Sequence, residues 1–429
     1  MKSLLVLCVL FAPLHADEGT ATPDPEQEAR ISYEGSQLLK VTAPTEEKKE
    51  VLQKLQDMEG VDTWLPLATN SSTVDVLVRP ETAGMVKEFL DNSGLTFNVV
   101  IDNLQAAIDT ENPTMTLEEM EELEGRKGHR MTWQSYHRLA DIHGYLDYLA
   151  QTYPQLVSLQ TIGSSVEGRP LKVLKISSGS PGRPAIWIDG GIHAREWISP
   201  ASVTYIINEL TENQEAHGEH VKSVDWYILP VLNPDGYEYS HRVDRLWRKN
   251  RQVSGHCAGT DLNRNFGYKW GGAGSSKEPC KEIYAGSRPF SEPESAAVSN
   301  FIQSHAGSMK AYVSFHSYGQ YILHPWGYVR GYPPDHADLS RVGHKIANAM
   351  YQAGGASYTV GGAAATLYPA SGGSDDWAKG AAGIKYSYTI ELRDRGFFGF
   401  ILPVQYILPT AREALAAVKT LASEITNVR

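Results

Sequence analysis

The chain has 429 residues, of which 41% are hydrophobic and 21% are charged, and its formal net charge is −11. This composition excludes a disordered chain and a membrane protein, and the length allows two or three folding units. The charge is uneven, because residues 17–130 carry 24 acidic and 10 basic side chains while the rest of the chain is nearly neutral. We therefore expect an acidic N-terminal region ahead of a larger main domain.

The first 16 residues have the pattern of a secretory signal peptide. Lys2 precedes an apolar run from Leu4 to Pro13, and the small Ala16 precedes the acidic Asp17. The run is too short to span a bilayer, and no later apolar stretch is long enough to do so. We expect cleavage after Ala16; a buried N-terminal helix is the alternative.

Only two of the three cysteines remain once the signal peptide has been removed. Cys8 lies within the signal, which leaves Cys257 and Cys280 as an even pair in an exported chain. An oxidising compartment favours a disulfide between them, and two free buried thiols are the alternative. A cysteine-based metal site would need more ligands, and only His256 is adjacent.

Residues 17–110 have the pattern of a small α+β open sandwich. In chain order we expect strands at 37–43, 73–80 and 96–102, and helices at 47–58 and 82–94. Strands that alternate with two helices over about a hundred residues form a two-layer domain. The one N-glycosylation sequon in the sequence begins at Asn70, within this region.

Residues 111–130 have the pattern of a helical connector. An acidic stretch ends in a basic cluster of Arg126, Lys127 and Arg130, which is suited to a protease that cuts after basic residues. An acidic exported domain, a connector and a basic cleavage site together indicate a zymogen. The alternative is an ordinary two-domain protein with a polar linker.

From residue 131 to residue 429, strand-like segments alternate with amphipathic helices. This pattern predicts one α/β domain with a mixed, largely parallel sheet and helices on both faces. The expected strands lie within residues 185–191, 224–237, 309–317 and 384–392, and the expected helices lie at 201–213, 292–305, 341–353 and 410–426. Ligands bind beyond the strand ends of such sheets, so the loops there are the place to look for a site.

Three of these strand ends carry side chains that can bind a metal or a proton. His193 and Glu196 follow the first strand, His316 ends another and Glu391 ends the last. Two imidazoles and a carboxylate match the three protein ligands of a catalytic zinc site, and a further carboxylate can serve as general base. Each residue also has a simpler interpretation: a surface loop for His193 and Glu196, a core histidine for His316, and an ion pair with Arg393 for Glu391.

Taken together, the motifs resemble the secreted zinc metallocarboxypeptidases of the pancreatic A/B type, in their proenzyme form. The resemblance covers nearly the whole chain and rests on the order and spacing of HAREW, RLWRKNR, DLNRNF, FHSYGQ, LYPASGGSDDW and IELRD. It implies the zinc carboxypeptidase fold, one Zn²⁺ ion, and hydrolysis of the last peptide bond of peptides and proteins. It also implies a pro-domain that inhibits the enzyme until a trypsin-like protease cleaves the connector. The enzyme would be a monomer secreted into a digestive lumen, without nucleic-acid or membrane partners.

The resemblance assigns roles to individual residues. His193, Glu196 and His316 would be the zinc ligands, Glu391 would be the base that activates water, and Arg248 would stabilise the oxyanion. A planar guanidinium beside an amide suits recognition of a terminal carboxylate. The remaining assignments are Asn263 and Arg264 for that carboxylate, Tyr368 as the residue that closes over it, Arg195, Ser317 and Tyr318 for the outer subsites, and Asp261 as the hydrogen-bond partner of His193.

The adjacent acids Asp375 and Asp376 bear on substrate preference. The family position of Asp375 is apolar in A-type enzymes and an aspartate in B-type enzymes, where it meets a C-terminal Lys or Arg. A buried carboxylate is unfavourable unless a cation meets it, so we expect a B-type preference, with Asp376 as a structural acid. A-type or broad preference is the alternative. The chain has one more residue between Tyr368 and Glu391 than is usual in the family, and Lys379 could neutralise Asp375. The other expected pocket residues are small or apolar: Leu323, Gly327, Ala363 and Ala370.

Other hydrolase classes lack their motifs in this sequence. Neither Gly-x-Ser-x-Gly nor His-Glu-x-x-His occurs. A zinc amidase acting on a small acyl amino acid could share the ligands, but the pro-domain, the disulfide and the DLNRNF segment favour a peptide C-terminus. A non-catalytic binding protein with the same fold is the alternative from a different functional class. Such a protein would be expected to lack a zinc ligand or the general base, and this sequence keeps all of them.

Overall fold

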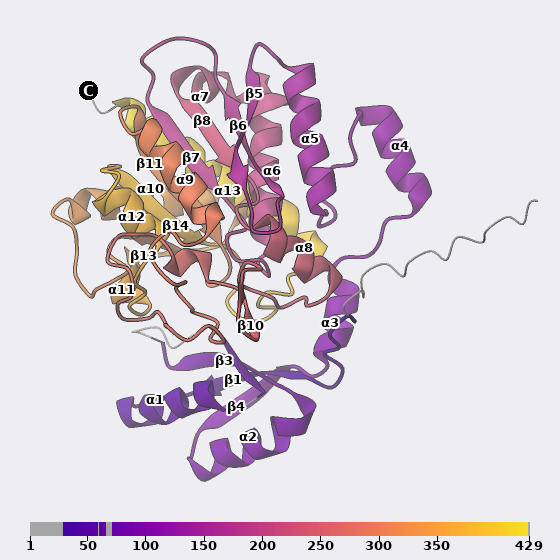
Figure 1. Cartoon of the computed structure of the whole chain (residues 1–429), viewed down its shortest axis with the longest axis vertical. Helices are drawn as coiled ribbons and strands as arrows, with labels where there is room; N and C mark the ends of the chain where they lie inside the picture. The colour runs from indigo at the N-terminus through magenta and orange to yellow at the C-terminus, as the bar shows by residue number, and fades with distance from the viewer. Residues whose placement is uncertain (1–28, 59, 66–70, 428–429) are drawn as a thin grey trace, which may run out of the picture.

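The computed structural model describes residues 29–58, 60–65 and 71–427. A small N-terminal domain packs against one end of a larger domain, and a connector joins the two (Figure 1). The expected signal peptide and the sequon residue Asn70 lie outside the described residues. Within those residues, no helix combines the length and the apolar character that a membrane span requires.

The small domain is an antiparallel sheet covered on one face by two helices. The strand order is β2-β3-β1-β4, and α1 and α2 lie on the face turned away from the large domain (Figure 1). Side chains alternate along the strands, so Leu39 and Val41 pack under the helices while Leu38 and Leu77 face the large domain. The elements are β1 (Gln37–Thr42), α1 (Glu46–Gln53), β2 (Val61–Leu65), β3 (Thr73–Val78), α2 (Pro80–Asn92) and β4 (Thr96–Ile101).

Helix α3 (Leu104–Glu111), which the sequence pattern did not predict, follows β4 in the small domain. Helix α4 (Leu117–Lys127) lies within the expected connector, residues 111–130, and is specified by its own sequence. The Thr116 hydroxyl accepts a hydrogen bond from the Glu119 backbone N–H, and the Glu119 carboxylate accepts one from Thr116 N–H in return. Acidic residues in the first turn and basic residues in the last complement the helix dipole. Gly128 ends the helix in the left-handed conformation, and no residue of α4 is buried. Residues 117–127 are therefore helical, and the domain boundaries stay a prediction.

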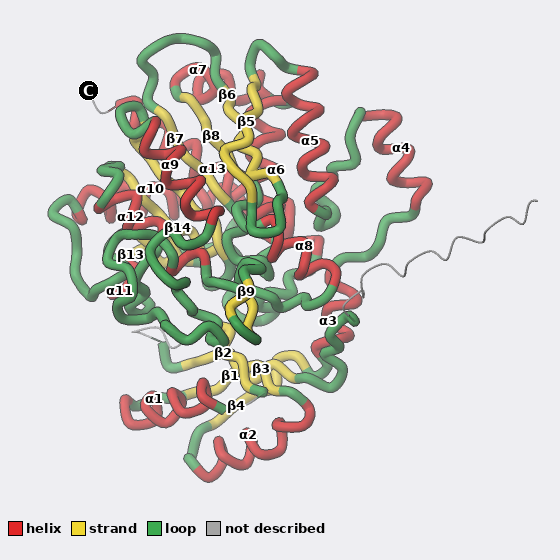
Figure 2. Tube along the Cα trace, viewed as in Figure 1, coloured by secondary structure: helices red, strands yellow, loops and turns green. Residues whose placement is uncertain are grey.

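The large domain is built on an eight-stranded mixed sheet (Figure 2). Four of its strand pairings are parallel, and the antiparallel ones lie toward the two edges. The strand order is β13 (Thr359–Gly362), β12 (Tyr321–His324), β14 (Tyr386–Glu391), β11 (Met309–His316), β7 (Ala185–Asp189), β8 (Asp225–Leu229), β6 (Pro170–Ile176) and β5 (Val157–Ser164).

Helices cover both faces of this sheet, as the sequence predicts. One face packs Ile186, Ile188 and Val313 against α5 (Leu139–Thr152), α6 (Ile198–Thr211), α10 (His336–Gly354) and α13 (Ile407–Asn427). The opposite face packs Trp187 and Tyr312 against α9 (Pro293–Ser304) and α12 (Ser374–Gly380). Each central strand is thus apolar on both sides, which is typical of parallel strands between two helical layers.

The sequence pattern missed several edge strands. β5 has only one buried residue, and β12 and β13 have only four residues each, so none of them shows the buried alternation of a core strand. The expected disulfide between Cys257 and Cys280 is present in the long loop before α9. The predicted fold class is confirmed.

Candidate active site

The carboxyl ends of β7, β11 and β14 bring the predicted metal-binding and acidic side chains together. These three strands are neighbours and parallel, so their ends meet at one edge of the sheet. His316 is the last residue of β11 and lies directly opposite Glu391, the last residue of β14. His193 and Glu196 reach the same point from the loop between β7 and α6.

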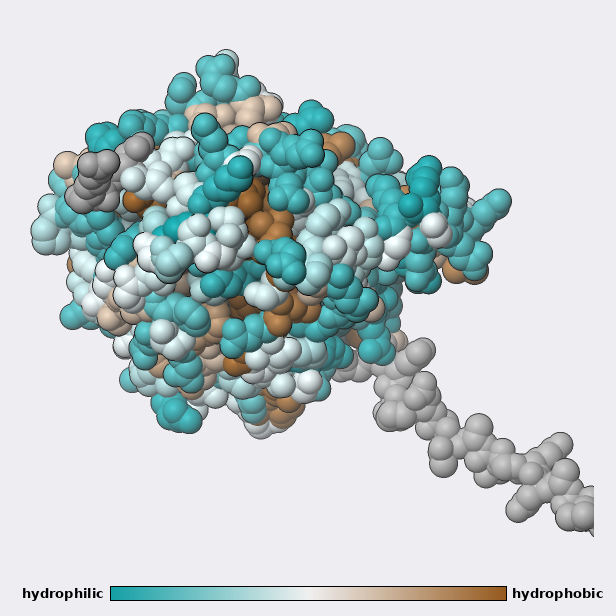
Figure 3. Space-filling view, turned by 90° about the horizontal axis from the view of Figure 1, so that it is seen from above, coloured by the Kyte–Doolittle hydropathy of each residue, from teal (hydrophilic) through white to brown (hydrophobic). Residues whose placement is uncertain are grey.

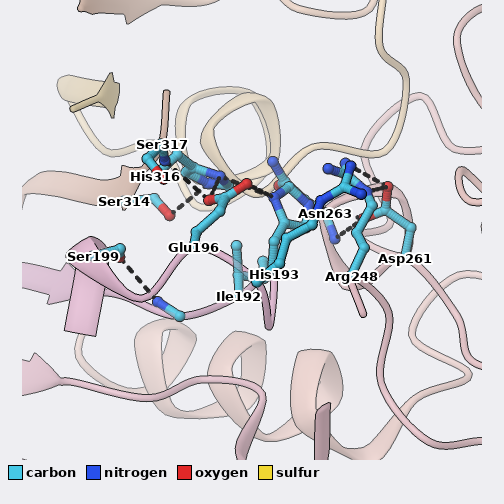
Figure 4. Close-up of polar contacts among 12 residues, drawn as sticks. Ile192, His193, Glu196, Ser199, Arg248, Asp261, Asn263, Ser314, His316 and Ser317 are labelled. Carbon is cyan, nitrogen blue, oxygen red and sulfur yellow. Dashed lines mark hydrogen bonds and ion pairs between the residues drawn. The ribbon is translucent and has the colours of Figure 1, made fainter. Parts of the chain in front are cut away.

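That loop depends on two glycines. Gly191 adopts a positive φ of 62°, and a Cβ on Gly190 would lie 2.8 Å from the Ser199 hydroxyl. The Ser199 hydroxyl accepts a hydrogen bond from Gly191 N–H (Figure 4). It donates one to the carbonyl of Phe315, which ties the loop to β11. The turn therefore holds His193 close to the end of β11.

His193, Glu196 and His316 form a buried cluster whose donor atoms all lie within 4.8 Å of one another. Glu196 Oε1 is 2.8 Å from His193 Nδ1, Glu196 Oε2 is 3.2 Å from His316 Nδ1, and the two Nδ1 atoms are 3.2 Å apart (Figure 4). Burial and the Arg248 charge lower the pKa of His193, which favours the neutral ring that binds metals. Two inward-facing imidazole nitrogens and a carboxylate fit a zinc ion.

Asp261 holds His193 and Arg248 from outside the cluster. Its Oδ1 lies 3.1 Å from His193 Nε2, and its Oδ2 accepts from Arg248 Nη2 at 2.8 Å. Burial alone would raise the pKa of Asp261, but Arg248, Arg264 and His193 hold it well below its usual range. The predicted contact between Asp261 and His193 is thus present, and Asp261 also orients the Arg248 guanidinium.

Arg264 and Asn263 lie beside Arg248, where the sequence placed a carboxylate-binding pair. Arg264 Nε donates to the carbonyl of Gly274 at 2.8 Å, and Asn263 Oδ1 accepts from Ser374 N–H at 2.9 Å. These hydrogen bonds to the surrounding backbone hold both side chains in place.

Most of the predicted site residues line one cavity of about 100 Å³, and only Arg195 and Asp261 of that set lie outside its lining. Glu391 lies in its wall, and burial together with the negative charge of Glu196 raises the pKa of Glu391 to about 8, against the opposing effect of His316. Arg393, the suggested alternative partner of Glu391, pairs with Glu413 instead. The cavity is lined by Trp64, His193, Glu196, Arg248, Asn263, Arg264, His316, Ser317, Tyr318, Leu323, Gly327, Ala363, Leu367, Tyr368, Ala370, Gly373, Asp375, Thr389, Glu391 and Phe400.

The two adjacent acids of α12 have different surroundings. The Asp376 carboxylate accepts hydrogen bonds from the backbone N–H groups of Gly327 and Tyr328, each at 2.8 Å, so it is the structural acid that the sequence suggested. Asp375 faces the cavity, is 6% exposed, and has its pKa raised by burial. Lys379 does not neutralise it, because the Lys379 ammonium lies 2.6 Å from Asp335.

The small domain reaches the cavity through β2 and β3. Arg195 Nη1 lies 3.0 Å from Asp62, and its guanidinium lies 4.2 Å from the centre of the Phe400 ring. The Tyr318 hydroxyl donates to Asp75 at 2.8 Å. The side chain of Trp64 lines the cavity itself. The predicted outer-subsite residues Arg195 and Tyr318 are therefore covered by the small domain.

Sequence reasoning missed five residues that line this cavity: Trp64, Leu367, Gly373, Thr389 and Phe400. Thr389 lies two positions before Glu391, and the period of two along β14 could have identified it. Trp64 and Phe400 have no comparable local signal. They meet through a contact of 5.1 Å between ring centres that joins two distant parts of the chain.

Comparisons with known proteins agree with this fold and site. Residues 142–417 match the model of the zinc carboxypeptidase family, and residues 39–111 match the carboxypeptidase activation peptide. Carboxypeptidase B of Astacus astacus is 46% identical over 69% of this chain and 99% of its own length, and carboxypeptidase A1 of Bos taurus is 37% identical over 100% and 99%. The solved structure of thrombin activatable fibrinolysis inhibitor superposes with a TM-score of 0.84 at 38% identity, covering 92% of this chain and all of that one.

The chain belongs to the zinc carboxypeptidase family and carries that family's activation peptide. It is an enzyme, and the presence of the activation peptide makes it a zymogen. Its relatives include carboxypeptidases named A and B, so membership of the family leaves the preferred C-terminal residue undetermined.

Proposed function

We propose that the activated enzyme removes single C-terminal residues by a zinc-dependent reaction and prefers Lys or Arg. The observation that carries the preference is Asp375, a buried carboxylate in the cavity that also holds the His–Glu–His cluster. Among the described residues, no Lys or Arg side chain lies within salt-bridge distance of it. A buried carboxylate without a Lys or Arg partner is unfavourable, so a cationic substrate side chain would be stabilised by pairing with Asp375.

Recognition of the chain end follows from the cations beside this pocket. Arg264, fixed by Gly274, would bind the terminal carboxylate together with the Asn263 amide, and Tyr368 would close over it. A carboxylate bound there places the last peptide bond, and no internal one, next to the metal ligands. This arrangement explains why the enzyme would act only at chain ends.

The chemistry would be shared among three groups of side chains. His193, Glu196 and His316 would hold zinc, which when bound polarises the scissile carbonyl and acidifies a water molecule. Glu391 would take the proton from that water and deliver it to the leaving amine, a role suited to a base whose pKa is raised toward neutral pH. Arg248, oriented by Asp261, would stabilise negative charge on the carbonyl oxygen.

A-type or broad preference is the second candidate. Leu323, Leu367, Ala363 and Ala370 make most of the remaining pocket wall apolar, which suits an aliphatic or aromatic side chain. An aliphatic end group would leave Asp375 buried without a cation, however, and this favours the basic preference.

We further propose that residues 17–110 are the inhibitory pro-domain. Trp64 occupies part of the cavity wall, and the Asp62–Arg195 ion pair and the Tyr318–Asp75 hydrogen bond engage two predicted subsite residues. A peptide could not reach those subsites while these contacts persist. Removal of residues 1–16 and secretion as a monomer complete the proposal and rest on the sequence pattern.

The central test is product analysis of the protease-activated enzyme. We expect peptides ending in Arg or Lys to lose one residue from the C-terminus, a chelator to abolish this release, and added zinc to restore it. Mass spectrometry of the products identifies each residue removed. Cleavage at internal bonds, or full activity in the zinc-free protein, would contradict the proposal.

The structure also favours an activation point. Arg126 lies at the end of the exposed helix α4, which projects from the body in Figure 1, and Figure 3 shows hydrophilic side chains over this projection. Arg130 is flanked by His129 and Met131, which are only 6% and 2% exposed. A protease binds several extended residues on each side of the cut, so cleavage after Arg126 or Lys127 requires the exposed last turn of α4 to open. Cleavage after Arg130 requires the buried side chains on both sides of the bond, His129 and Met131, to leave the protein interior first, which costs more.

We therefore predict that the first cut falls after Arg126 or Lys127. An Arg126→Gln/Lys127→Gln variant should be activated by trypsin at least about tenfold more slowly, whereas Arg130→Gln should match the wild type. N-terminal sequencing of the mature form checks the position. Initial cleavage between Arg130 and Met131 would show that burial of the His129 and Met131 side chains does not protect this bond.

A further inference from the structure

The two histidines of the predicted zinc site are held differently on their outer sides. Both turn Nδ1 toward Glu196. His193 Nε2 meets the Asp261 carboxylate directly, at 3.1 Å. His316 Nε2 instead lies 3.2 Å from the hydroxyl of Ser314, a contact drawn in Figure 4. Ser314 in turn donates to Asp189 Oδ1 at 2.6 Å, so a second buried carboxylate stands behind the second histidine.

The register of the sheet builds this chain of contacts. Ser314 of β11 pairs directly with Asp189 of the parallel strand β7, and opposite residues of paired strands point to the same face. His316 lies two positions after Ser314, so its side chain also points to that face. A one-residue slip of either strand would separate the three side chains, which is why only this register connects Asp189 to the site.

Asp189 is a buried acid with no assigned role in the proposed reaction. It is fully buried, and its other oxygen accepts a hydrogen bond from Trp187 Nε1 at 2.7 Å. In the part of the chain that the structure describes, the hydrogen-bond partners of its carboxylate are neutral side chains, and no Lys or Arg is paired with it. An isolated buried carboxylate is costly, and a divalent cation held by His316 is the positive charge best placed to compensate it.

We propose that Asp189 and Ser314 are positioning residues for the metal and act through His316. The His316 Nε2–H donates to the Ser314 oxygen, and the Ser314 O–H donates to Asp189. This pattern fixes the tautomer in which Nδ1 keeps its lone pair for the metal, and it makes the ring a better ligand. The inference rests on the proposed function, because it takes His316 to be a zinc ligand.

The test is zinc affinity of the purified full-length protein, measured by competition with a chromophoric chelator, so that no activity is needed. Ser314→Ala removes a single oxygen atom, and we expect zinc binding to weaken by about 10–100-fold. Asp189→Asn, which cannot accept both the Ser314 and the Trp187 hydrogen bonds, should weaken it similarly. Ser299→Ala is the matched control, because Ser299 is also buried but its hydroxyl bonds the carbonyl of Ala296 in α9, away from the predicted metal ligands.

Thermal unfolding with and without zinc separates metal positioning from a purely structural role. A positioning role leaves the melting temperature of zinc-free Ser314→Ala near that of the zinc-free wild type and reduces the stabilisation that added zinc produces. A lower melting temperature with unchanged zinc affinity would overturn the proposal.

His316→Ala distinguishes failure of this inference from failure of the proposed function. If His316→Ala binds zinc as tightly as the wild type, the ligand set is wrong and both proposals fall. If His316→Ala loses zinc while Ser314→Ala and Asp189→Asn keep wild-type affinity, only the role of Asp189 and Ser314 is refuted.

Discussion

The Glu391→Gln variant of the activated enzyme is expected to lose nearly all peptide hydrolysis, with kcat reduced on the order of 10²–10⁴-fold. Glu391 lies opposite His316 in the sheet and lines the cavity that holds the metal-binding cluster. Glutamine keeps the shape and one acceptor oxygen of this side chain, but it cannot take a proton from water. Steady-state kcat and KM for an N-blocked dipeptide ending in Arg measure the effect.

Metal content and KM show whether the site survives the substitution. The variant should bind one zinc ion and keep KM within a few-fold of the wild type, because neither the ligands nor Arg264 has changed. Glu238→Gln is the matched control, since Glu238 bonds Arg138 and the backbone of Leu139 on another part of the domain. A fall in kcat of less than about tenfold would mean that another group accepts the proton.

Replacing Asp375 by Ile is expected to invert the substrate preference. The wild type should release C-terminal Arg faster than Phe, and the variant should lose about 3–5 kcal/mol of transition-state stabilisation for Arg, on the order of 10²–10⁴-fold in kcat/KM. Release of Phe should rise, because the pocket floor becomes apolar beside Leu323 and Ala363. The ratio of kcat/KM for two peptides that differ only in the last residue is the measurement.

The neighbouring acid provides the control for this substitution. Asp376→Asn loses an acceptor for the backbone N–H groups of Gly327 and Tyr328, so it should lower stability by about 1–3 kcal/mol without changing the Arg-to-Phe ratio. A wild-type preference for Phe, or an Arg preference that survives in Asp375→Ile, would refute the assignment of Asp375 and favour the A-type candidate.

Short-range features of this protein could be predicted because their determinants are adjacent in the sequence. Helix α4 carries its own capping box, its complementary terminal charges and Gly128, so it forms without any buried residue. The alternation in β1 assigns Leu39 to the helical side and Leu38 to the other. His316 and Glu391 could be recognised because each polar residue ends an apolar strand.

The arrangement of the site depends on contacts between residues far apart in the chain. Lys379 lies four positions from Asp375 in the sequence, and only the fold shows that it pairs with Asp335. Likewise, Asp62 and Trp64 are unremarkable in their own segment until β2 reaches the cavity and meets Arg195 and Phe400.

The sequence itself specifies the residue types, the strand ends and the local helix signals, because neighbouring side chains and backbone periodicity produce them. Sheet register and domain packing specify which of these groups share a buried space. Ser314 bonds Asp189 because β11 and β7 pair in one register, and no local pattern in either strand encodes that pairing. In the same way, Lys379 does not pair with Asp375, because the tertiary structure directs its ammonium to Asp335.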